Sequence, residues 1–371
     1  MKNNDSRKKV YLEVMRIVAC ALVIFSHTSG FAFILLSPHS AFMQWPYLAI
    51  AMITRINVPT FFMISGALLL GKKSDYGDII KRKIPRMAVV LLVFETFVYS
   101  FYFITGHNEK TESFRIGHLL YGFFSNDLNE CYPYWFLYAY LGFLLALPLM
   151  QCIAAYLQKK DFIVLIAIHF AIKTFIPIVN LFLNEAGKEC IVISEDFSVP
   201  FAAIKAFFYP LIGYYLDHAV DIRAMGAKTV RRLLYIAFAG ITISCCCTYW
   251  EGRHLGFFTE NYAELFDYVS AAVFFVVIKY ISYRFSLKER KKGKKVAVRQ
   301  AVCLIGSATF GIYLFDPLFR MIFYRNLEGF LSGILLLHPL TVSVVWLCFS
   351  MTLGGTVTLL LKKLPVFNQL L

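Results

Sequence analysis

The sequence predicts an all-α, polytopic membrane protein with about ten transmembrane helices and both termini in the cytoplasm. Three observations predict this fold class. Hydrophobic residues make up 59% of the 371-residue chain and charged residues only 16%, whereas soluble domains average about 45–50% and about 25%. The apolar residues come in long blocks. Lys and Arg number 37 against 23 Asp and Glu, a net charge of +14, and the excess lies on one side of the predicted membrane.

The apolar blocks are each long enough for a helix that crosses the hydrocarbon core, which takes about 20 residues. Only helices and closed barrels pair all backbone polar groups in lipid. A barrel would show alternating segments of about ten residues, and these runs are longer and continuously apolar. The predicted spans are 12–36, 46–70, 84–106, 133–155, 161–183, 199–217, 231–250, 262–283, 298–323 and 336–361.

The loops on the two sides of the predicted membrane differ in charge. The side with both termini carries 26 Lys and Arg, and the other side carries 5 together with eleven acidic residues. The positive-inside rule therefore places both termini in the cytoplasm. We expect a single integral-membrane domain over residues 1–371 without a separate soluble domain, and the long apolar blocks exclude a free nucleic-acid-binding protein. The spacing of Cys and His does not resemble a zinc site, so we expect no metal.

Two ionisable residues of the first span share one face of the helix. Arg16 and His27 are eleven residues apart, which is about 20° more than three full turns and a rise of about 16 Å. Arg16 would lie near the cytoplasmic surface, with His27 about halfway across in line with it. An anion bound at Arg16 would then extend a flexible arm to His27. The alternative is that His27 only packs or forms a hydrogen bond, although ionisable groups at this depth are costly and often functional.

A basic segment leads into the third span. Lys83 and Arg86 are three residues apart and flank Pro85, which suits the first turn of a helix. Paired cations at a membrane surface suit phosphate recognition. The alternative for this segment is a plain topology anchor.

Several motifs resemble those of the acyltransferase 3 family, and they occur in the same order along nearly the whole chain. The first is its Arg-x10-His motif, matched by Arg16 and His27 after Tyr11-Leu12-Glu13. Residues 57–66 resemble its V-P-x-F-F-x-x-S-G segment, and residues 83–86 resemble its Arg-x-x-Arg element, with Lys in the first place. Residues 134–137 resemble its W-F segment, and residues 310–317 resemble its F-G-I-Y-L-x-H-P segment. Asp316 departs from the pattern, because the family usually has His there.

The resemblance implies an integral-membrane O-acyltransferase of surface carbohydrates in a bacterial type of plasma membrane. It implies acyl-CoA, usually acetyl-CoA, as a cytoplasmic co-substrate without a tightly bound cofactor, and a glycan as acceptor. His27 would act with Arg16, either as general base or by accepting the acyl group itself. The donor phosphates would be bound by Arg82, Lys83 and Arg86. The candidates for binding the acceptor or stabilising an oxyanion are Asn57, Ser65, Tyr134, Trp135, Tyr313 and Asp316.

Two other functions remain open from the residues. A transporter that exports a glycan or a lipid-linked intermediate would also have many spans and buried charges. Such transporters often show inverted repeats, and we find no matching pair of halves. The remaining alternative is a family member that has lost activity and serves as a sensor or assembly partner, against which the presence of both Arg16 and His27 argues.

Overall fold

The chain forms two compact units in the computed structural model. Unit 1 comprises Met1–Lys73 and Leu149–Gly306, and unit 2 comprises Ser74–Pro148 and Ser307–Leu371. We describe each unit by itself. The structure describes residues 9–28, 41–104, 115–126, 128–194, 197, 199–288, 292–324, 326–327, 329–330 and 339–370.

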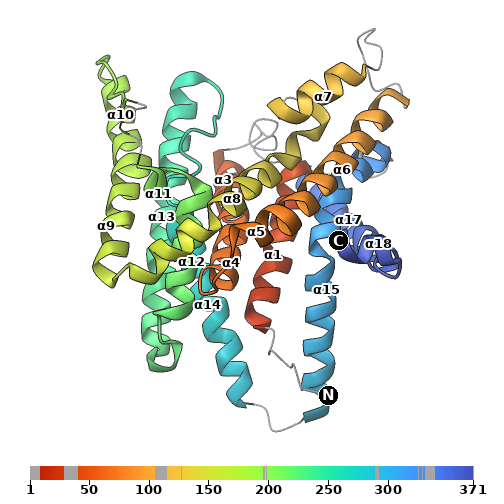
Figure 1. Cartoon of the computed structure of the whole chain (residues 1–371). Helices are drawn as coiled ribbons and strands as arrows, with labels where there is room; N and C mark the ends of the chain where they lie inside the picture. Colours follow the sequence, from red (N-terminus) through yellow and green to blue (C-terminus); the bar gives the residue numbers. More distant parts are fainter. Residues whose placement is uncertain are drawn as a thin grey trace. The chain divides into compact units, whose positions relative to one another are not determined.

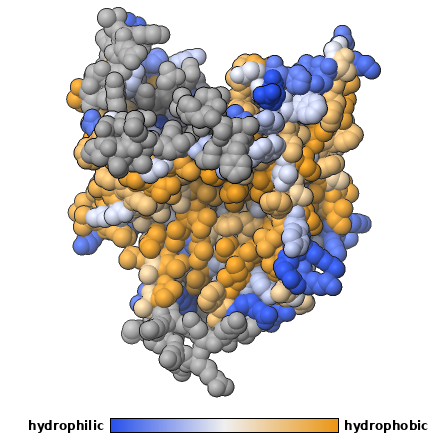
Figure 2. Space-filling model, turned by 180° about the vertical axis from the view of Figure 1, so that it is seen from behind, coloured by the Kyte–Doolittle hydropathy of each residue, from blue (hydrophilic) through white to orange (hydrophobic). Residues whose placement is uncertain are grey.

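The predicted fold class is confirmed. Helices account for 86% of the structure and the described residues contain no strand. Apolar side chains dominate the surface of the helices (Figure 2), as expected for segments that face lipid. Among the described residues, nine helical segments are long and apolar enough to cross a membrane: Val10–Thr28, Gln44–Leu69, Tyr76–Ile104, Cys131–Tyr156, Lys159–Glu185, Ala227–Leu255, Asp267–Phe285, Ala297–Tyr324 and Leu340–Leu361. Residues 29–36 of the first predicted span lie outside the described residues.

The helices of the two units are labelled in Figure 1. Those of unit 1 are α1 (Val10–Thr28), α3 (Ala41–Thr54), α4 (Asn57–Leu69), α9 (Lys159–Phe170), the π-helix η3 (Ala171–Phe175), α10 (Ile176–Glu185), α11 (Pro200–Ala203), α12 (Lys205–His218), the 3₁₀ helix η5 (Ile222–Ala224), α13 (Ala227–Leu255) and α14 (Asp267–Lys288). Those of unit 2 are α5 (Tyr76–Asp78), the π-helix η1 (Ile79–Lys83), α6 (Ile84–Ile104), α7 (Ile116–Ser125), the 3₁₀ helix η2 (Asn129–Tyr134), the π-helix η6 (Arg320–Tyr324), α17 (Pro339–Leu361) and α18 (Pro365–Leu370). Two helices, α8 (Trp135–Tyr156) and α15 (Lys292–Phe319), continue from one unit into the other.

Two predicted spans differ from the structure. The span predicted at 199–217 is helical but broken, because Ile204 has extended backbone (φ −89°, ψ 119°) between α11 and α12. Each piece is therefore shorter than a spanning helix. The span predicted from 262 begins instead at Asp267, because the preceding residues return along α13 without forming a helix.

The second span is also interrupted, at a turn between α3 and α4. Arg55 and Ile56 form a tight turn, in which the Ile56 N–H donates to the Ile53 carbonyl at 3.4 Å. Pro59 has no N–H to donate to the carbonyl four residues earlier, that of Arg55. The side chain of Asn57 accepts from the Val58 N–H at 2.6 Å, so a side-chain acceptor replaces a backbone one. The V-P motif thus marks a helix break within the span.

The core of unit 1 includes a close crossing of α4 and α12 (Figure 1). A Cβ added at Gly66 would lie 1.9 Å from the Pro210 carbonyl oxygen, and one at Gly213 would lie 2.1 Å from that of Met63. The two backbones therefore touch, and only glycine fits at either position. Small residues permit this kind of close approach between membrane helices.

The first prediction concerns this crossing. We expect Gly66→Ala to lower the free energy of unfolding by about 1–3 kcal/mol, because the backbones must separate to admit the methyl group. The measurement is thermal unfolding of the purified protein in detergent. Gly142→Ala is the matched control, since a Cβ there meets no atom within 4 Å. Equal stability of the two variants would contradict the close packing.

Candidate active site

Arg16 and His27 lie on one unbroken helix, α1. The predicted rise of about 16 Å between them therefore applies. Arg16 is held by Glu13, whose Oε2 accepts from Arg16 Nη1 at 2.7 Å. The Glu13 side chain is 11% exposed and the Arg16 side chain 26% exposed. A guanidinium has five N–H donors, so this one contact with Glu13 leaves capacity for binding an anion.

A glycine on α15 leaves room for the Glu13 side chain. A Cβ added at Gly306 would lie 2.3 Å from Glu13 Oε2. The carboxylate that orients Arg16 would therefore have to shift if residue 306 carried a side chain. The position of the guanidinium depends on packing as well as on charge.

His27 is half-buried and is the next-to-last residue of α1. Its neighbour Ser26 accepts from Asn57 Nδ2 at 3.4 Å and donates to the Val23 carbonyl at 2.8 Å. The end of α1 therefore lies beside the start of α4, at the break described above. Of the sequence candidates in unit 1, Asn57 is thus placed next to the residue that precedes His27.

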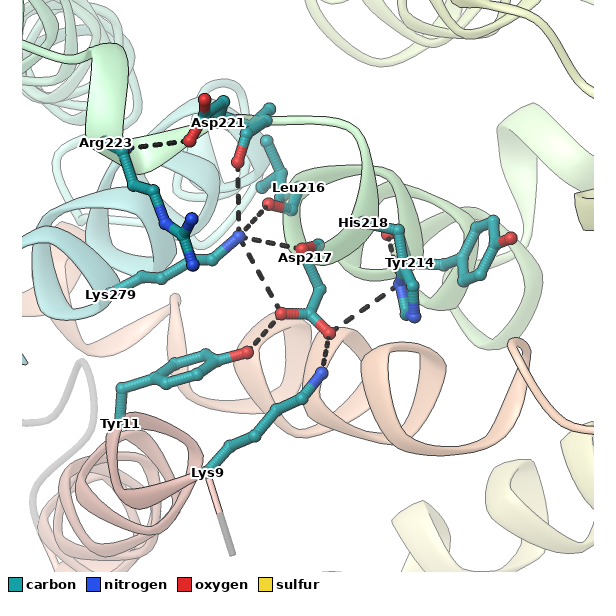
Figure 3. Close-up of polar contacts among 10 residues, drawn as sticks. Lys9, Tyr11, Tyr214, Leu216, Asp217, His218, Asp221, Arg223 and Lys279 are labelled. Atoms are coloured by element: carbon teal, nitrogen blue, oxygen red, sulfur yellow. Dashed lines mark hydrogen bonds and ion pairs between the residues drawn. The ribbon is translucent and has the colours of Figure 1, made fainter. Parts of the chain in front are cut away.

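The cytoplasmic start of α1, in the orientation that the charges predict, is attached to α12 and α14 through Asp217 (Figure 3). The Asp217 side chain is 2% exposed. It accepts from the Lys9 ammonium and from the Tyr11 hydroxyl, and Lys279 Nζ lies 3.8 Å from its Oδ1. One buried carboxylate therefore joins three helices and fixes where α1 begins.

Lys279 also closes the end of α12. Its ammonium donates to the carbonyls of Leu216, Asp217 and Val220 at 2.9, 2.8 and 3.3 Å. The last carbonyls of a helix have no partner within it, and a cation also interacts favourably with the helix dipole there. The intramembrane Lys279 is therefore explained by capping.

The predicted donor-binding residues lie at the start of the third span, in unit 2. The π-helix η1 contains Arg82 and Lys83, and α6 follows without interruption. The Arg82 side chain is 83% exposed and 3.5 Å from Asp78. Lys83 is half-buried, and Arg86 is exposed and donates to the Leu370 carbonyl at 3.3 Å. All three cations belong to one exposed helical segment.

The remaining candidates contact protein atoms. The hydroxyl of Tyr134 donates to the Leu314 carbonyl at 2.6 Å, and that of Tyr313 donates to the Pro133 carbonyl. This reciprocal pair fastens the start of α8 to α15 within unit 2. The Ser65 hydroxyl donates to the Phe61 carbonyl at 2.9 Å, within its own helix. Each of these hydroxyl protons already has a backbone acceptor.

Asp316, which stands in the place of the family's His, connects α15 to α17. It is fully buried, and its Oδ1 accepts from Trp346 Nε1 at 3.2 Å and from the Ser350 hydroxyl at 2.7 Å. Trp135 is half-buried, and its ring centroid lies 6.5 Å from that of Phe136. Among the described residues, no group of three His, Cys, Asp or Glu side chains is arranged to hold a metal ion.

Sequence reasoning missed Asp217 and the orienting role of Glu13. A signal for Asp217 exists, because it is an acidic residue at the end of a span on the side where basic residues predominate. Its partners Lys9 and Lys279 are far away in the chain, so the pairing itself required the folded structure.

The second prediction concerns Asp217. We expect Asp217→Asn to lower the free energy of unfolding by about 1–3 kcal/mol, because the Lys9 and Lys279 ammoniums lose the charge of their acceptor. Thermal unfolding in detergent measures this. The control is Asp75→Asn, since Asp75 is exposed and caps α5 by accepting from the Gly77 N–H. A loss of stability no greater than in the control would contradict the assigned role.

Comparison with known proteins identifies the family of the chain. No curated protein and no solved structure matches the chain. A family model described as an acyltransferase domain matches residues 9–353, which include α1 and most of both units. The chain is thus a membrane protein that belongs to the acyltransferase 3 family.

Proposed function

We propose that the protein is a membrane O-acyltransferase. It moves an acyl group, acetyl by family preference, from cytoplasmic acyl-CoA to a hydroxyl of a cell-surface polysaccharide or related glycan in the plasma membrane of a bacterial type of cell. The observation that carries the proposal is the single helix α1, which has Arg16 and His27 on one face about 16 Å apart. Membership of an acyltransferase family supplies the reaction class.

Acyl transfer with His27 as base needs no reactant besides the acyl-CoA donor and the acceptor hydroxyl. A nitrogen of neutral His27 takes the proton of the acceptor hydroxyl while the oxygen attacks the thioester carbon. The C–S bond breaks, an O–C ester bond forms, and the proton goes on to the CoA thiolate. In the alternative route His27 first accepts the acyl group and then passes it to the hydroxyl. Both routes need the imidazole within reach of the thioester.

Asn57 is the donor that we propose for the developing oxyanion. An amide nitrogen has two N–H groups, and one of those on Asn57 is directed at Ser26, beside His27. Preorganised donors of this kind stabilise the charge that develops in acyl transfer. We assign Tyr134, Tyr313 and Asp316 to helix packing, because each already bonds to another helical segment of unit 2. The Ser65 hydroxyl bonds within its own helix. Trp135 remains a candidate for stacking against a sugar.

The third prediction tests His27. In membrane vesicles given radiolabelled acetyl-CoA, we expect His27→Ala to reduce the transfer of label to the glycan fraction by about 100-fold or more, the usual contribution of an acid–base group. Amounts of inserted protein must match between variants. The control is His254→Ala, since His254 is exposed and pairs with Glu185 at 2.8 Å. Undiminished transfer by His27→Ala would rule out the catalytic role.

The fourth prediction tests the donor-binding residues. We propose that Arg82, Lys83 and Arg86 bind the CoA phosphates, supported by their exposure and positive charge. Removing a charged hydrogen-bonding group costs about 1.5–3 kcal/mol. Lys83→Met and Arg86→Met should therefore each raise the acetyl-CoA concentration at half-maximal rate about tenfold or more. Lys160→Met, which alters an exposed lysine in the first turn of α9, should leave it unchanged. Equal values in all three variants would refute donor binding by this segment.

A transporter of a glycan intermediate is the second candidate, and the breaks at Arg55 and Ile204 favour it. Broken helices near the middle of the membrane form the substrate sites of many transporters. A transporter would move glycan across vesicle membranes without consuming acetyl-CoA. Such flux, undiminished in His27→Ala, would favour this candidate over acyl transfer.

A further inference from the structure

The segment 256–266 folds back along the helix that precedes it. Gly256 ends α13 with left-handed backbone (φ 78°), where a side chain would be strained. A Cβ at Gly252 would lie 2.5 Å from the Phe258 ring, and one at Gly240 would lie 2.9 Å from Phe266. Between these two contacts the segment runs back along α13 from Gly252 to Gly240, which is twelve residues or about 18 Å along the helix axis.

The lower end of the segment therefore brings non-helical backbone to the middle of the membrane. The 29 residues of α13 are about 44 Å long, and Gly240 is near their middle. At the lower end of the segment α14 begins with Asp267, which accepts from the Tyr209 hydroxyl on α12 at 2.9 Å. At the upper end Glu251 accepts from Asn261 Nδ2 at 2.7 Å and so holds the segment against α13.

Two carboxylates of the segment pair with cations at the two helix breaks. Glu260 lies 2.8 Å from Arg55, in the turn between α3 and α4. Glu264 accepts from Lys205 through both oxygens, at 2.7 and 2.6 Å, and Lys205 is the first residue of α12 after the extended Ile204. Glu260 is at the upper end of the segment, because its neighbours Thr259 and Asn261 both donate to Glu251, and Glu264 is deeper. We call Arg55, Lys205, Glu260 and Glu264 the charge cluster.

The charge cluster is not shielded by protein. The Glu260 and Glu264 side chains are 60% and 44% exposed, and those of Arg55 and Lys205 are 23% and 35% exposed. Charges in contact with hydrocarbon are very costly, and irregular backbone at membrane depth occurs only where protein covers it or water reaches it. Glu264 is below the upper end of the segment, so its exposed carboxylate requires water within the membrane.

We propose that the charge cluster is a water-accessible site, open to the side opposite the termini and reaching down to Glu264, that binds the hydroxyl-bearing acceptor. The orientation follows from the charge asymmetry of the loops, because segment 256–266 connects to the end of α13 that faces away from the cytoplasm. The proposal rests on the proposed function and adds to it the place where the acceptor binds.

The chemistry of the cluster suits a polyol. Carboxylates accept hydrogen bonds from hydroxyl groups, and ammonium and guanidinium groups donate to them. The cluster offers acceptors on Glu260 and Glu264 and donors on Arg55 and Lys205. Neighbouring hydroxyl groups of a sugar can bind to such a combination of donors and acceptors. It also adjoins the proposed catalytic residues along the chain. Arg55 is two residues from Asn57, which donates to the neighbour of His27.

The first part of the test measures water access and does not depend on activity. Intact cells that express Glu264→Cys or Glu260→Cys are treated with a membrane-impermeant sulfonated maleimide. Mass spectrometry resolves the labelled site, because the chain has nine native cysteines. We expect labelling at both residues, and residue 264 decides the test because residue 260 is at the upper end of the segment. The matched control is Phe238→Cys, since Phe238 is 69% exposed and lies two residues from Gly240 on α13, at the depth where the segment ends. It should stay unlabelled.

The second part measures acetyl transfer in vesicles with radiolabelled acetyl-CoA. Glu264→Gln should lower the rate about tenfold, the effect of weakening one charged hydrogen bond. The acetyl-CoA concentration at half-maximal rate should not change, because the donor enters from the cytoplasm. Glu185→Gln, which alters a carboxylate paired with His254 at 2.8 Å outside the cluster, should transfer at the wild-type rate. Maleimide-treated Glu260→Cys should lose transfer, whereas treated wild type should retain it.

The outcomes separate this inference from the proposed function. Failure to label residue 264, or equal labelling of residue 238, overturns the water-accessible site. Labelling with wild-type transfer in both Glu264→Gln and treated Glu260→Cys overturns acceptor binding. A rise in the acetyl-CoA requirement of Glu264→Gln would assign the cluster to the donor instead, which also overturns the proposal. Absence of transfer in the wild type itself would count against the proposed function, while the labelling would still decide water access.

Discussion

A charge inside a membrane must meet an opposite charge, a backbone carbonyl or water, and the structure of unit 1 depends on this requirement. Most of the intramembrane ion pairs of unit 1 meet it through an opposite charge, whereas Asp267 accepts from the Tyr209 hydroxyl. Asp217 is buried among Lys9, Tyr11 and Lys279, and Glu13 pairs with Arg16. The charge cluster combines pairing with exposure. Pairing without exposure stabilises the arrangement of helices, whereas pairing with exposure leaves groups that a ligand can contact.

The backbone obeys a parallel rule, because an N–H or C=O in lipid also needs a partner. The breaks at Arg55 and Ile204 release backbone groups within two spans, and the segment 256–266 adds eleven residues without regular hydrogen bonding. Glycines permit the tight packing that surrounds them, as at Gly66 and Gly213 between α4 and α12. Irregular backbone beside a rigid helix crossing is a suitable place for a binding site, because the surroundings hold it in position.

The sequence predicted much of this arrangement from simple rules. Hydropathy located nine spans that the structure contains, and the motifs indicated the family that the matching model shows. The remaining predicted span, 199–217, was wrong as a continuous helix, because its apolar composition does not reveal the extended residue Ile204. The start at 262 was wrong for a related reason, since apolar residues there pack along α13 instead of forming a turn of helix.

The sequence by itself determined the class of protein, the spans, the charge asymmetry and the eleven-residue spacing of Arg16 and His27. These follow from composition and helical periodicity, which are local properties. Only the tertiary structure decided which charges meet. Lys205 and Glu264 are 59 residues apart and Lys9 and Asp217 are 208 apart, and no local pattern encodes such pairs. The return of segment 256–266 likewise depends on contacts with α13, α3 and α12, so the proposed acceptor site exists only in the folded chain.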